Sequence, residues 1–475
     1  MASSSSGGAS ASMRAGMRAG MSAGTGDERR AIDDYHALLT DDVGGESHRV
    51  LEEQLRHRGL FFGERALCTV LRPRFLTPAQ YRFLQERGAI VLRAFRKASE
   101  AALRDDALLD QFGLTDWERE LVRVDTGVPD ASPVSRLDAF FSADGGGMSF
   151  TEYNAETPAG GGYNDVLTEA FYALPAMRRF LRAWDLRPIP ARHHVLQALL
   201  ESWEAFSGGR SRPRVAIVDW KEVPTWNEFL IFQDYFRRQG LEVDIVDPRD
   251  ITFAGGELKG PGGRIDVVYK RVLLHELVER GGADHPILQA VRARKVCMVN
   301  PPACKILHKK SSLAVLSDER NARLFDEEER EAIGMSIPWT RVVEDRRTTR
   351  NGRTIDLLAT IADEREQLVL KPNDEYGGKG IVLGWEVSPE EWDEAIQTAL
   401  VQPYIVQQRI ALPKEAYPSW VDGKVEILDR MVDTAPYVAH GRYVDGCLSR
   451  LGTAALLNVT AGGGSQTPTF LVEKR

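Results

Sequence analysis

The spacing of apolar residues changes along the chain, and each change predicts a different kind of structure. In residues 76–103, LTPAQYRFLQERGAIVLRAFRKASEAAL, apolar residues recur three and four positions apart, and Thr77 before Pro78 is a typical helix start. We therefore expect a mainly helical region over residues 27–130. Farther along, two β-like runs flank the turn sequence DGGG at 144–147, which predicts a β-hairpin within residues 131–213.

Residues 214–304 alternate apolar strand patterns with helical ones. The strand patterns are RVAIVDW, LEVDIVD, DVVYKR and VCMVNPP, and the amphipathic NEFLIFQDYFRRQG, which ends at Gly240, separates the first two. Strands that alternate with helices are typical of a parallel sheet covered on both faces. The expected fold class is therefore α/β (α+β).

Residues 305–475 show a third pattern, in which strands predominate. Strands are predicted at WTRVV, DLLATI, QLVLKP, YIVQQRI and VEILDRMV, and a β-rich segment follows to the C-terminus. SPEEWDEAIQTAL is predicted to be a helix, and the polar EDRRTTRNGRT a solvated loop.

Composition narrows the class of protein. The chain of 475 residues is long enough for about three domains, and 43% hydrophobic with 27% charged residues is ordinary for a soluble protein. The net charge of −8 argues against a nucleic-acid partner. No apolar run approaches a membrane span, and four widely spaced cysteines predict buried thiols of a reducing cytoplasm. Residues 1–26 are expected to be a disordered tail, although Arg14, Arg18 and the lack of acids leave a transit peptide open.

The predicted hairpin carries the first candidate site. Residues two apart on a strand share a face, so Glu152 and Asn154 point the same way, as do Arg136 and Asp138. A hairpin centred near Gly145 sets Asp138 opposite Glu152 and Arg136 opposite Asn154, whereas a slip of one residue would reverse the facing. Carboxylate and amide oxygens suit Mg²⁺, and a guanidinium suits a phosphoryl oxygen. The alternative is an exposed hairpin with one cross-strand Arg–Glu pair.

The residues just after this hairpin allow two interpretations each. Glu156 is either a further ligand or a surface acid. Glycines 160–162 precede a predicted helix, so their amides would suit an anion, but a plain loop-to-helix joint is equally compatible.

A second glycine-rich stretch lies more than two hundred residues downstream. Lys371 ends an apolar strand, and Gly377–Gly380 with Lys379 would let backbone amides approach phosphate oxygens. The spacing fits neither the P-loop nor GxGxxG, and in isolation it also suits a flexible turn. Upstream, Lys310 opens a helix, with Lys309 as the second choice and a solvated pair as the alternative.

The strand YIVQQRI and the C-terminal segment complete the candidate residues. Backbone groups beside Gln407 and Gln408 would serve a flat base, or the strand is simply part of the core. Arg450, in CLSRLG, and Asn458, before a GGG run, form a polar C-terminal group.

Together these elements resemble the circularly permuted ATP-grasp family, of the glutathionylspermidine synthase type, over roughly residues 72–468. RLD followed by EYNAETP is similar to the family's Arg-x-Asp and Glu-x-Asn elements, and they precede the lysines and the YGGKGI loop in the permuted order. The resemblance implies a helical region (27–130), a permuted ATP-grasp segment with the hairpin (131–213), a Rossmann-like pre-ATP-grasp domain (214–304) and nucleotide-binding subdomains (305–475).

The resemblance also implies a role for each group of residues. Metal ligands would be Asp138, Glu152 and Asn154. Nucleotide-binding residues would be Lys310, Lys371, Tyr376, Gly377, Gly378, Lys379, Gly380, Gln407 and Gln408. Arg136 and Arg450 would be catalytic, and Arg271, Glu156 and Asn458 would contact the substrate. Gln408 stands where many relatives have Glu, and a fused amidase domain is lacking.

The implied activity is that of an ATP-dependent carboxylate–amine ligase with ATP and two Mg²⁺. A carboxylate would attack the γ-phosphoryl group, and an amine would displace phosphate from the acyl phosphate. Its partners would be a small-molecule or peptide acid and an amine, in the cytoplasm, without nucleic acid or membrane. One alternative is an inactive ATP-binding protein that acts as a sensor or assembly partner. A second alternative is a dinucleotide-binding oxidoreductase, which ranks lower because residues 214–304 lack GxGxxG after their first strand.

Overall fold

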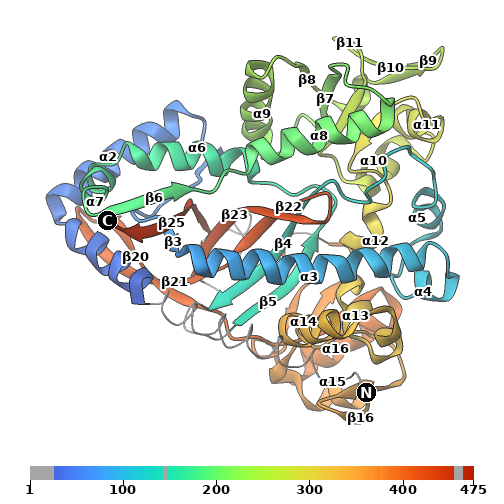
Figure 1. Cartoon of the computed structure of the whole chain (residues 1–475). Helices are drawn as coiled ribbons and strands as arrows, with labels where there is room; N and C mark the ends of the chain where they lie inside the picture. The colour runs from blue at the N-terminus through green and yellow to red at the C-terminus, as the bar shows by residue number, and fades with distance from the viewer. Residues whose placement is uncertain (1–25, 143–146, 376, 454–463) are drawn as a thin grey trace, which may run out of the picture.

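The computed structural model describes residues 26–142, 147–375, 377–453 and 464–475 (Figure 1). Almost all of the predicted tail lies outside these ranges, and residue 26 already belongs to a helix over 26–38. No helix of the described ranges is long and apolar enough to cross a membrane. The four cysteines are buried free thiols, as predicted.

A seven-stranded sheet joins the first half of the chain to its end. The predicted hairpin is confirmed as β4 (Val134–Ser142) and β5 (Gly147–Asn154), and β22 (Ala435–Ala439) pairs antiparallel with β4. The strand order is β20-β21-β23-β22-β4-β5, with β24 paired to β23. The other members are β20 (Lys414–Val421), β21 (Lys424–Val432), β23 (Tyr443–Gly452) and β24 (Ser465–Thr467).

One face of the hairpin is buried under the long helix α3 (Pro78–Ala102), which crosses the sheet in Figure 1. Leu137, Phe150 and Tyr153 point into this core, where the Tyr153 ring lies 4.8 Å from that of Phe95. The predicted start of α3 is confirmed, because Thr77 forms a capping box with Gln80. The opposite face of the hairpin carries polar residues of β4 and β5.

The N-terminal region is mainly helical, as predicted, and it is tied to the C-terminus. Besides the helix over 26–38 it contains α2 (Asp41–His57), α4 (Asp106–Asp110), α5 (Asp116–Leu121) and the short strands β1 (Phe61–Phe62), β2 (Arg65–Ala66) and β3 (Arg74–Leu76). β25 (Thr469–Lys474) pairs in parallel with β3 and antiparallel with β6 (Trp184–Pro188). Helices α6 (Gly161–Tyr172) and α7 (Pro175–Phe180) pack against this end.

The predicted parallel sheet is confirmed. β7 (Arg214–Val218), β8 (Glu242–Val246), β12 (Val267–Lys270) and β13 (Cys297–Val299) run parallel in the order β13-β12-β7-β8. Helices α8 (Arg192–Ser207) and α9 (Trp226–Arg238) cover one face, and α10 (Leu274–Gly281) and α11 (Pro286–Arg292) cover the other. A small sheet of β9 (Thr252–Ala254), β10 (Glu257–Gly260) and β11 (Gly263–Arg264) follows β8.

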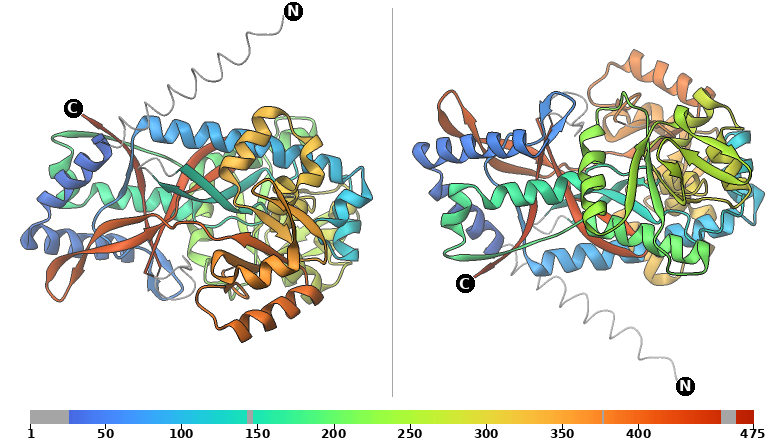
Figure 2. Two further views of the ribbon diagram at one scale, coloured as in Figure 1. Left: turned by 90° about the horizontal axis from the view of Figure 1, so that it is seen from below. Right: turned by 90° about the horizontal axis from the view of Figure 1, so that it is seen from above.

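The third sheet is antiparallel, in the order β14-β19-β17-β18. Its strands are β14 (Thr340–Val342), β17 (Leu368–Pro372), β18 (Val382–Leu383) and β19 (Tyr404–Gln408). Helices α15 (Leu357–Asp363) and α16 (Pro389–Val401) cover one face of this sheet. α12 (Cys304–His308), α13 (Ser311–Ser317) and α14 (Glu327–Ser336) lead into it. Figure 2 shows this orange unit and the green parallel sheet at the same end of the molecule, opposite the C-terminus.

Two local predictions in this third part were wrong. DLLATI is not a strand: Asp356 accepts a hydrogen bond from Ala359 and caps α15. The expected solvated loop EDRRTTRNGRT instead forms the hairpin of β15 (Arg347–Arg350) and β16 (Arg353–Asp356). Its turn residues Asn351 and Gly352 both have positive φ, 50° and 75°, which favours this tight turn.

Candidate active site

The hairpin register is the predicted one where the candidate ligands lie. Asp138 pairs with Glu152 and Arg136 with Asn154, and the register shifts only beyond Asp138. These four residues therefore share the face that α3 does not cover. Asn154 is partly exposed on this face.

Asp138 is held by two arginines from opposite ends of the sequence. Arg136 grips it bidentately, with Nε–Oδ1 and Nη2–Oδ2 distances of 2.7 and 3.1 Å, and Nη2 of Arg450 on β23 lies 2.7 Å from Oδ2. Burial alone would raise the pKa of Asp138, but the two guanidinium groups hold that pKa well below its usual range. The buried carboxylate is therefore ionised and paired with both guanidinium groups.

Two lysines, one before α13 and one on the third sheet, lie on the same face of the hairpin. Nζ of Lys310, just before α13, lies 3.0 Å from Oε1 of Glu152. Nζ of Lys371, on β17, lies 3.5 Å from the carbonyl oxygen of Thr151 and donates to Oε1 of Gln407 at 2.7 Å. Burial lowers the pKa of Lys371 to about 8, against the opposing effect of Glu152. For Glu152 itself, burial raises the pKa, but Lys310 and Lys371 together lower it below its usual value.

The glycine-rich stretch begins close to these lysines. Nζ of Lys310 donates to the carbonyl oxygen of Glu375 at 2.6 Å. Gly377, Gly378 and Gly380 have φ values of 69°, 78° and 71°, a region that residues with a Cβ adopt at a cost. Lys379 is exposed and pairs with Glu375 at 3.4 Å. Two predicted residues, Tyr376 and Asn458, lie outside the described residues.

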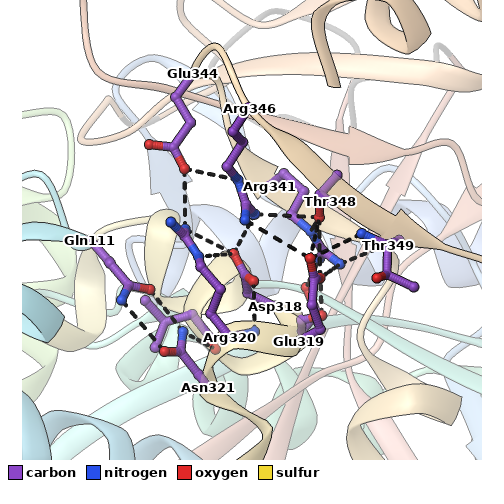
Figure 3. A network of polar contacts seen from close by, with 12 residues as sticks. Gln111, Asp318, Glu319, Arg320, Asn321, Arg341, Glu344, Arg346, Thr348 and Thr349 are labelled. Atoms are coloured by element: carbon purple, nitrogen blue, oxygen red, sulfur yellow. Dashed lines mark hydrogen bonds and ion pairs between the residues drawn. The ribbon is translucent and has the colours of Figure 1, made fainter. Parts of the chain in front are cut away.

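The two predicted glutamines have different surroundings. Gln407 faces Lys371 and also donates to Oγ1 of Thr340 at 3.0 Å. Gln408 is exposed and lines a cavity of about 490 Å³ beside the end of β19, together with Ser149 of the hairpin. Figure 3 shows a polar network on one side of this cavity, which ties β14 and the residues after this strand to residues 318–321, just after α13. Its charged members are Asp318, Glu319, Arg320, Arg341, Glu344 and Arg346.

The other predicted contacts are engaged inside the protein. Glu156 is fully buried between Lys270 and Lys305, at 3.0 and 3.2 Å. Nη1 of Arg271 donates to the carbonyl oxygen of Pro158 at 2.5 Å. The amides of Gly160 and Gly162 at the start of α6 do face an anion, but it is the buried carboxylate of Glu228, at 2.7 and 3.0 Å.

One residue of this site was not foreseen. Asp433, between β21 and β22, lies 2.5 Å from Arg450 and also accepts from its backbone amide at 2.6 Å. Burial raises the pKa of Asp433, because the attraction of Arg450 offsets it only in part. A single Asp after an apolar strand carries no signal for such a role. Lys309, the second choice beside Lys310, points away from Glu152 toward Glu118 and Asp374, each at 2.8 Å.

Comparisons with known proteins find sequence relatives of low identity. No protein-family model matches the sequence. The chain is 27% identical over 353 residues to a Frankia casuarinae protein named "Putative glutamate–cysteine ligase 2-2", covering 70% of this chain and 38% of that protein. It is 26% identical over 262 residues to an uncharacterized protein of Synechocystis sp., covering 51% of each. The chain thus spans well under two thirds of the length of either relative.

A solved structure matches nearly the whole chain. The glutathione synthetase-like effector of Globodera pallida, in its apo form, superposes with a TM-score of 0.56 over 90% of this chain and 96% of its own, at 12% identity. At that identity the likeness shows a shared fold, a mixed α/β architecture of the kind that the sequence predicted.

Proposed function

We propose that this chain is an ATP-dependent carboxylate–amine ligase on a circularly permuted ATP-grasp scaffold. The observation that carries the proposal is the meeting of Lys310 and Lys371 with the carboxylates of Asp138 and Glu152 on one face. The lysines follow the acids in the sequence, yet α13 packs against β5, so that Lys310 meets Glu152 and Lys371 meets Thr151. The domain limits proposed are 27–130, 131–213, 214–304 and 305–475, with 214–304 as a Rossmann-like unit.

The residues present fit Mg²⁺ and a triphosphate. Asp138, Glu152 and Asn154 offer the oxygen atoms that Mg²⁺ prefers, and we propose that they hold one or two such ions. Bound there, Mg²⁺ would neutralise charge on the phosphate oxygens. Lys310, Lys371, the amides of residues 377–380 and Lys379 would contact the phosphates.

The ion pairs of the site suggest an order of events in which ATP displaces the carboxylates from their cationic partners. Each carboxylate is now neutralised by a cationic side chain: Glu152 by Lys310, and Asp138 by Arg136 and Arg450. A triphosphate would compete for these cations, and the carboxylates would then become free to accept a metal ion. Buried charges thus remain paired throughout, which avoids the cost of an isolated buried ion.

The chemistry follows from this arrangement. The carboxylate of one substrate would attack the γ-phosphoryl group of ATP, releasing ADP and forming an acyl phosphate, and an amine would displace phosphate to form the amide. Arg136 and Arg450 would stabilise charge on the transferred phosphoryl group and the acyl phosphate. The glycine-rich stretch would cover the phosphates and exclude water. Arg271 and Glu156 are less suited to bind substrate, since Nη1 of Arg271 donates to Pro158 and Glu156 is paired with Lys270.

A cavity beside the end of β19 is our candidate site for the base of ATP. The cavity of about 490 Å³ is lined by Gln408 and by the apolar side chains of Ile337 and Trp339. We propose that it receives the adenine, while Gln407 keeps Lys371 directed toward the phosphates. The name of the Frankia relative, a ligase, supports the reaction class, and the effector supports the fold.

The decisive experiment is a screen for ADP and phosphate release with pooled amino acids, peptides and polyamines. We expect substrate-stimulated release by the wild type and none by the Glu152→Ala, Asn154→Ala double variant, with an unchanged circular dichroism spectrum. Undiminished turnover by the double variant would refute the site. Binding of MgATP without turnover across the panel would instead favour the sensor.

A further inference from the structure

A cluster of ionised side chains, all buried except the partly exposed Asp374, lies directly behind the proposed phosphate site. Six side chains from five segments of the chain form this buried ion cluster: Glu118, Glu156, Lys270, Lys305, Lys309 and Asp374. Glu118 comes from α5 in the N-terminal region and Asp374 from the stretch after β17. The proposed mechanism uses none of these as a ligand of the nucleotide.

Lys305 is the centre of the cluster. Its Nζ lies 2.7 Å from Oδ1 and 2.7 Å from Oδ2 of Asp374, 3.2 Å from Glu156 and 3.5 Å from Glu118. Lys309 bridges Glu118 and Asp374 at 2.8 Å each, and Lys270 contacts Glu156 at 3.0 Å. The three acids and three lysines balance in charge, which makes their burial tolerable.

This cluster is unsuited to a metal ion, although Glu156, His308 and Asp374 bring possible ligand atoms within 4.8 Å of one another. The ammonium group of Lys305 already contacts both carboxylates and supplies the positive charge that a metal would bring. Burial lowers the pKa of His308 to about 4, against the opposing effect of Glu156, so its neutral ring adds no charge to the cluster. The cluster is therefore a closed set of ion pairs.

The cluster is linked to the phosphate site through residues adjacent in sequence. The carbonyl oxygen of Asn373 accepts from the amide of Lys310 at 2.9 Å, and its Oδ1 accepts from the amide of Ser311 at 2.9 Å. Glu375, on the other side of Asp374, accepts from Nζ of Lys310 at 2.6 Å. Asp374 thus sits between two contacts that fix Lys310 to the start of the glycine-rich stretch.

We propose that the buried ion cluster is a positioning device for the nucleotide site. Lys305 and Lys309, by holding Asp374, set the place where the glycine-rich stretch leaves β17 relative to Lys310. Glu118 brings the N-terminal helical region into this device, although α5 supplies no ligand. This inference rests on the proposed function, because it assigns the cluster to the binding of MgATP.

The test uses variants of the full-length chain that act on the cluster without touching the site. Glu118→Gln removes one charge, and Glu118→Gln combined with Lys309→Met removes a balanced pair and so guards against misfolding. The matched control is Glu415→Gln, which breaks a buried pair with Arg72 and Arg74 near the N-terminal region. MgATP affinity, by titration calorimetry, is compared with the thermal midpoint for each variant.

We expect both cluster variants to weaken MgATP binding about tenfold or more, while Glu415→Gln lowers the thermal midpoint but leaves affinity unchanged. Glu118→Gln and Asp374→Asn are expected to be non-additive, since they share partners. Wild-type affinity in a folded Glu118→Gln variant, or an equal loss in the Glu415 control, would overturn the inference alone. A wild type that binds no MgATP would overturn the proposed function and the inference with it.

Discussion

Lys371 gives the sharpest prediction, because its pKa of about 8 lies within the range of ordinary binding experiments. The pKa is lowered from the usual Lys value, so the empty site loses its proton as the pH rises through about 8. Phosphate oxygens beside Nζ favour the protonated form and would raise this pKa in the complex. MgATP affinity is therefore expected to be high below pH 8 and to fall above it.

The magnitude follows from the fraction of protonated Lys371. With a pKa of about 8, that fraction is about 90% at pH 7 and about 10% at pH 9. The association constant for MgATP should then fall about tenfold over this interval, equivalent to about 1.4 kcal/mol. Titration calorimetry at several pH values, in buffers of matched ionic strength, measures this directly.

Two variants separate Lys371 from other titrating groups. Lys371→Met should bind MgATP weakly at pH 7 and lose the tenfold slope, because the titrating ammonium is gone. Lys424→Met removes an exposed lysine paired with Glu426 on β21 and should keep both the affinity and the slope. An unchanged slope in Lys371→Met, or pH-independent binding by the wild type, would refute the reasoning.

The remaining predictions concern other parts of the site. Asp433→Asn should lower the rate of ADP formation about 10- to 100-fold with little change in MgATP affinity, because it removes the carboxylate that pairs with Arg450. Steady-state kinetics would show a lower kcat at a nearly unchanged KM for ATP. Gly378→Ala should raise the KM for ATP, because a Cβ at φ 78° costs about 1–2 kcal/mol, whereas Gly423→Ala, in a turn with φ 84°, should leave KM unchanged. The four cysteines should resist a thiol reagent until the chain is unfolded, and rapid labelling of the native protein would contradict their burial.

The sequence was most informative where a local pattern has one structural solution. The alternation around residues 144–147 defined the hairpin, and it paired Asp138 with Glu152 correctly. The irregularity beyond Asp138 shifts the rest of the hairpin by one residue, and no composition signal announces it. For α15 and the β15–β16 hairpin, Asp356 and Asn351-Gly352 carry capping and turn signals, whereas the apolar run of 357–361 and the many charges of 344–353 favour the wrong structures.

Contacts between distant segments were the part that local patterns did not reveal. Asp433 and the buried ion cluster consist of charged residues whose neighbours in sequence look like those of solvated faces. These residues are buried only because several distant segments meet. A buried charge of this kind can be predicted from the sequence only if the oppositely charged residue beside it is already known. The meeting of the hairpin with the lysines was anticipated through the family resemblance rather than through spacing.

The pairing of β4 with β22 has a consequence for biosynthesis. When the ribosome has released β4 and β5, the strand that completes their edge is still roughly 300 residues from being translated, about 15–60 s at ordinary elongation rates. During that interval the nascent hairpin exposes an unpaired strand, which invites association with other chains. Premature termination before β22 would leave every polypeptide in that state, so the product of a late stop codon should depend on chaperones far more than the complete protein does.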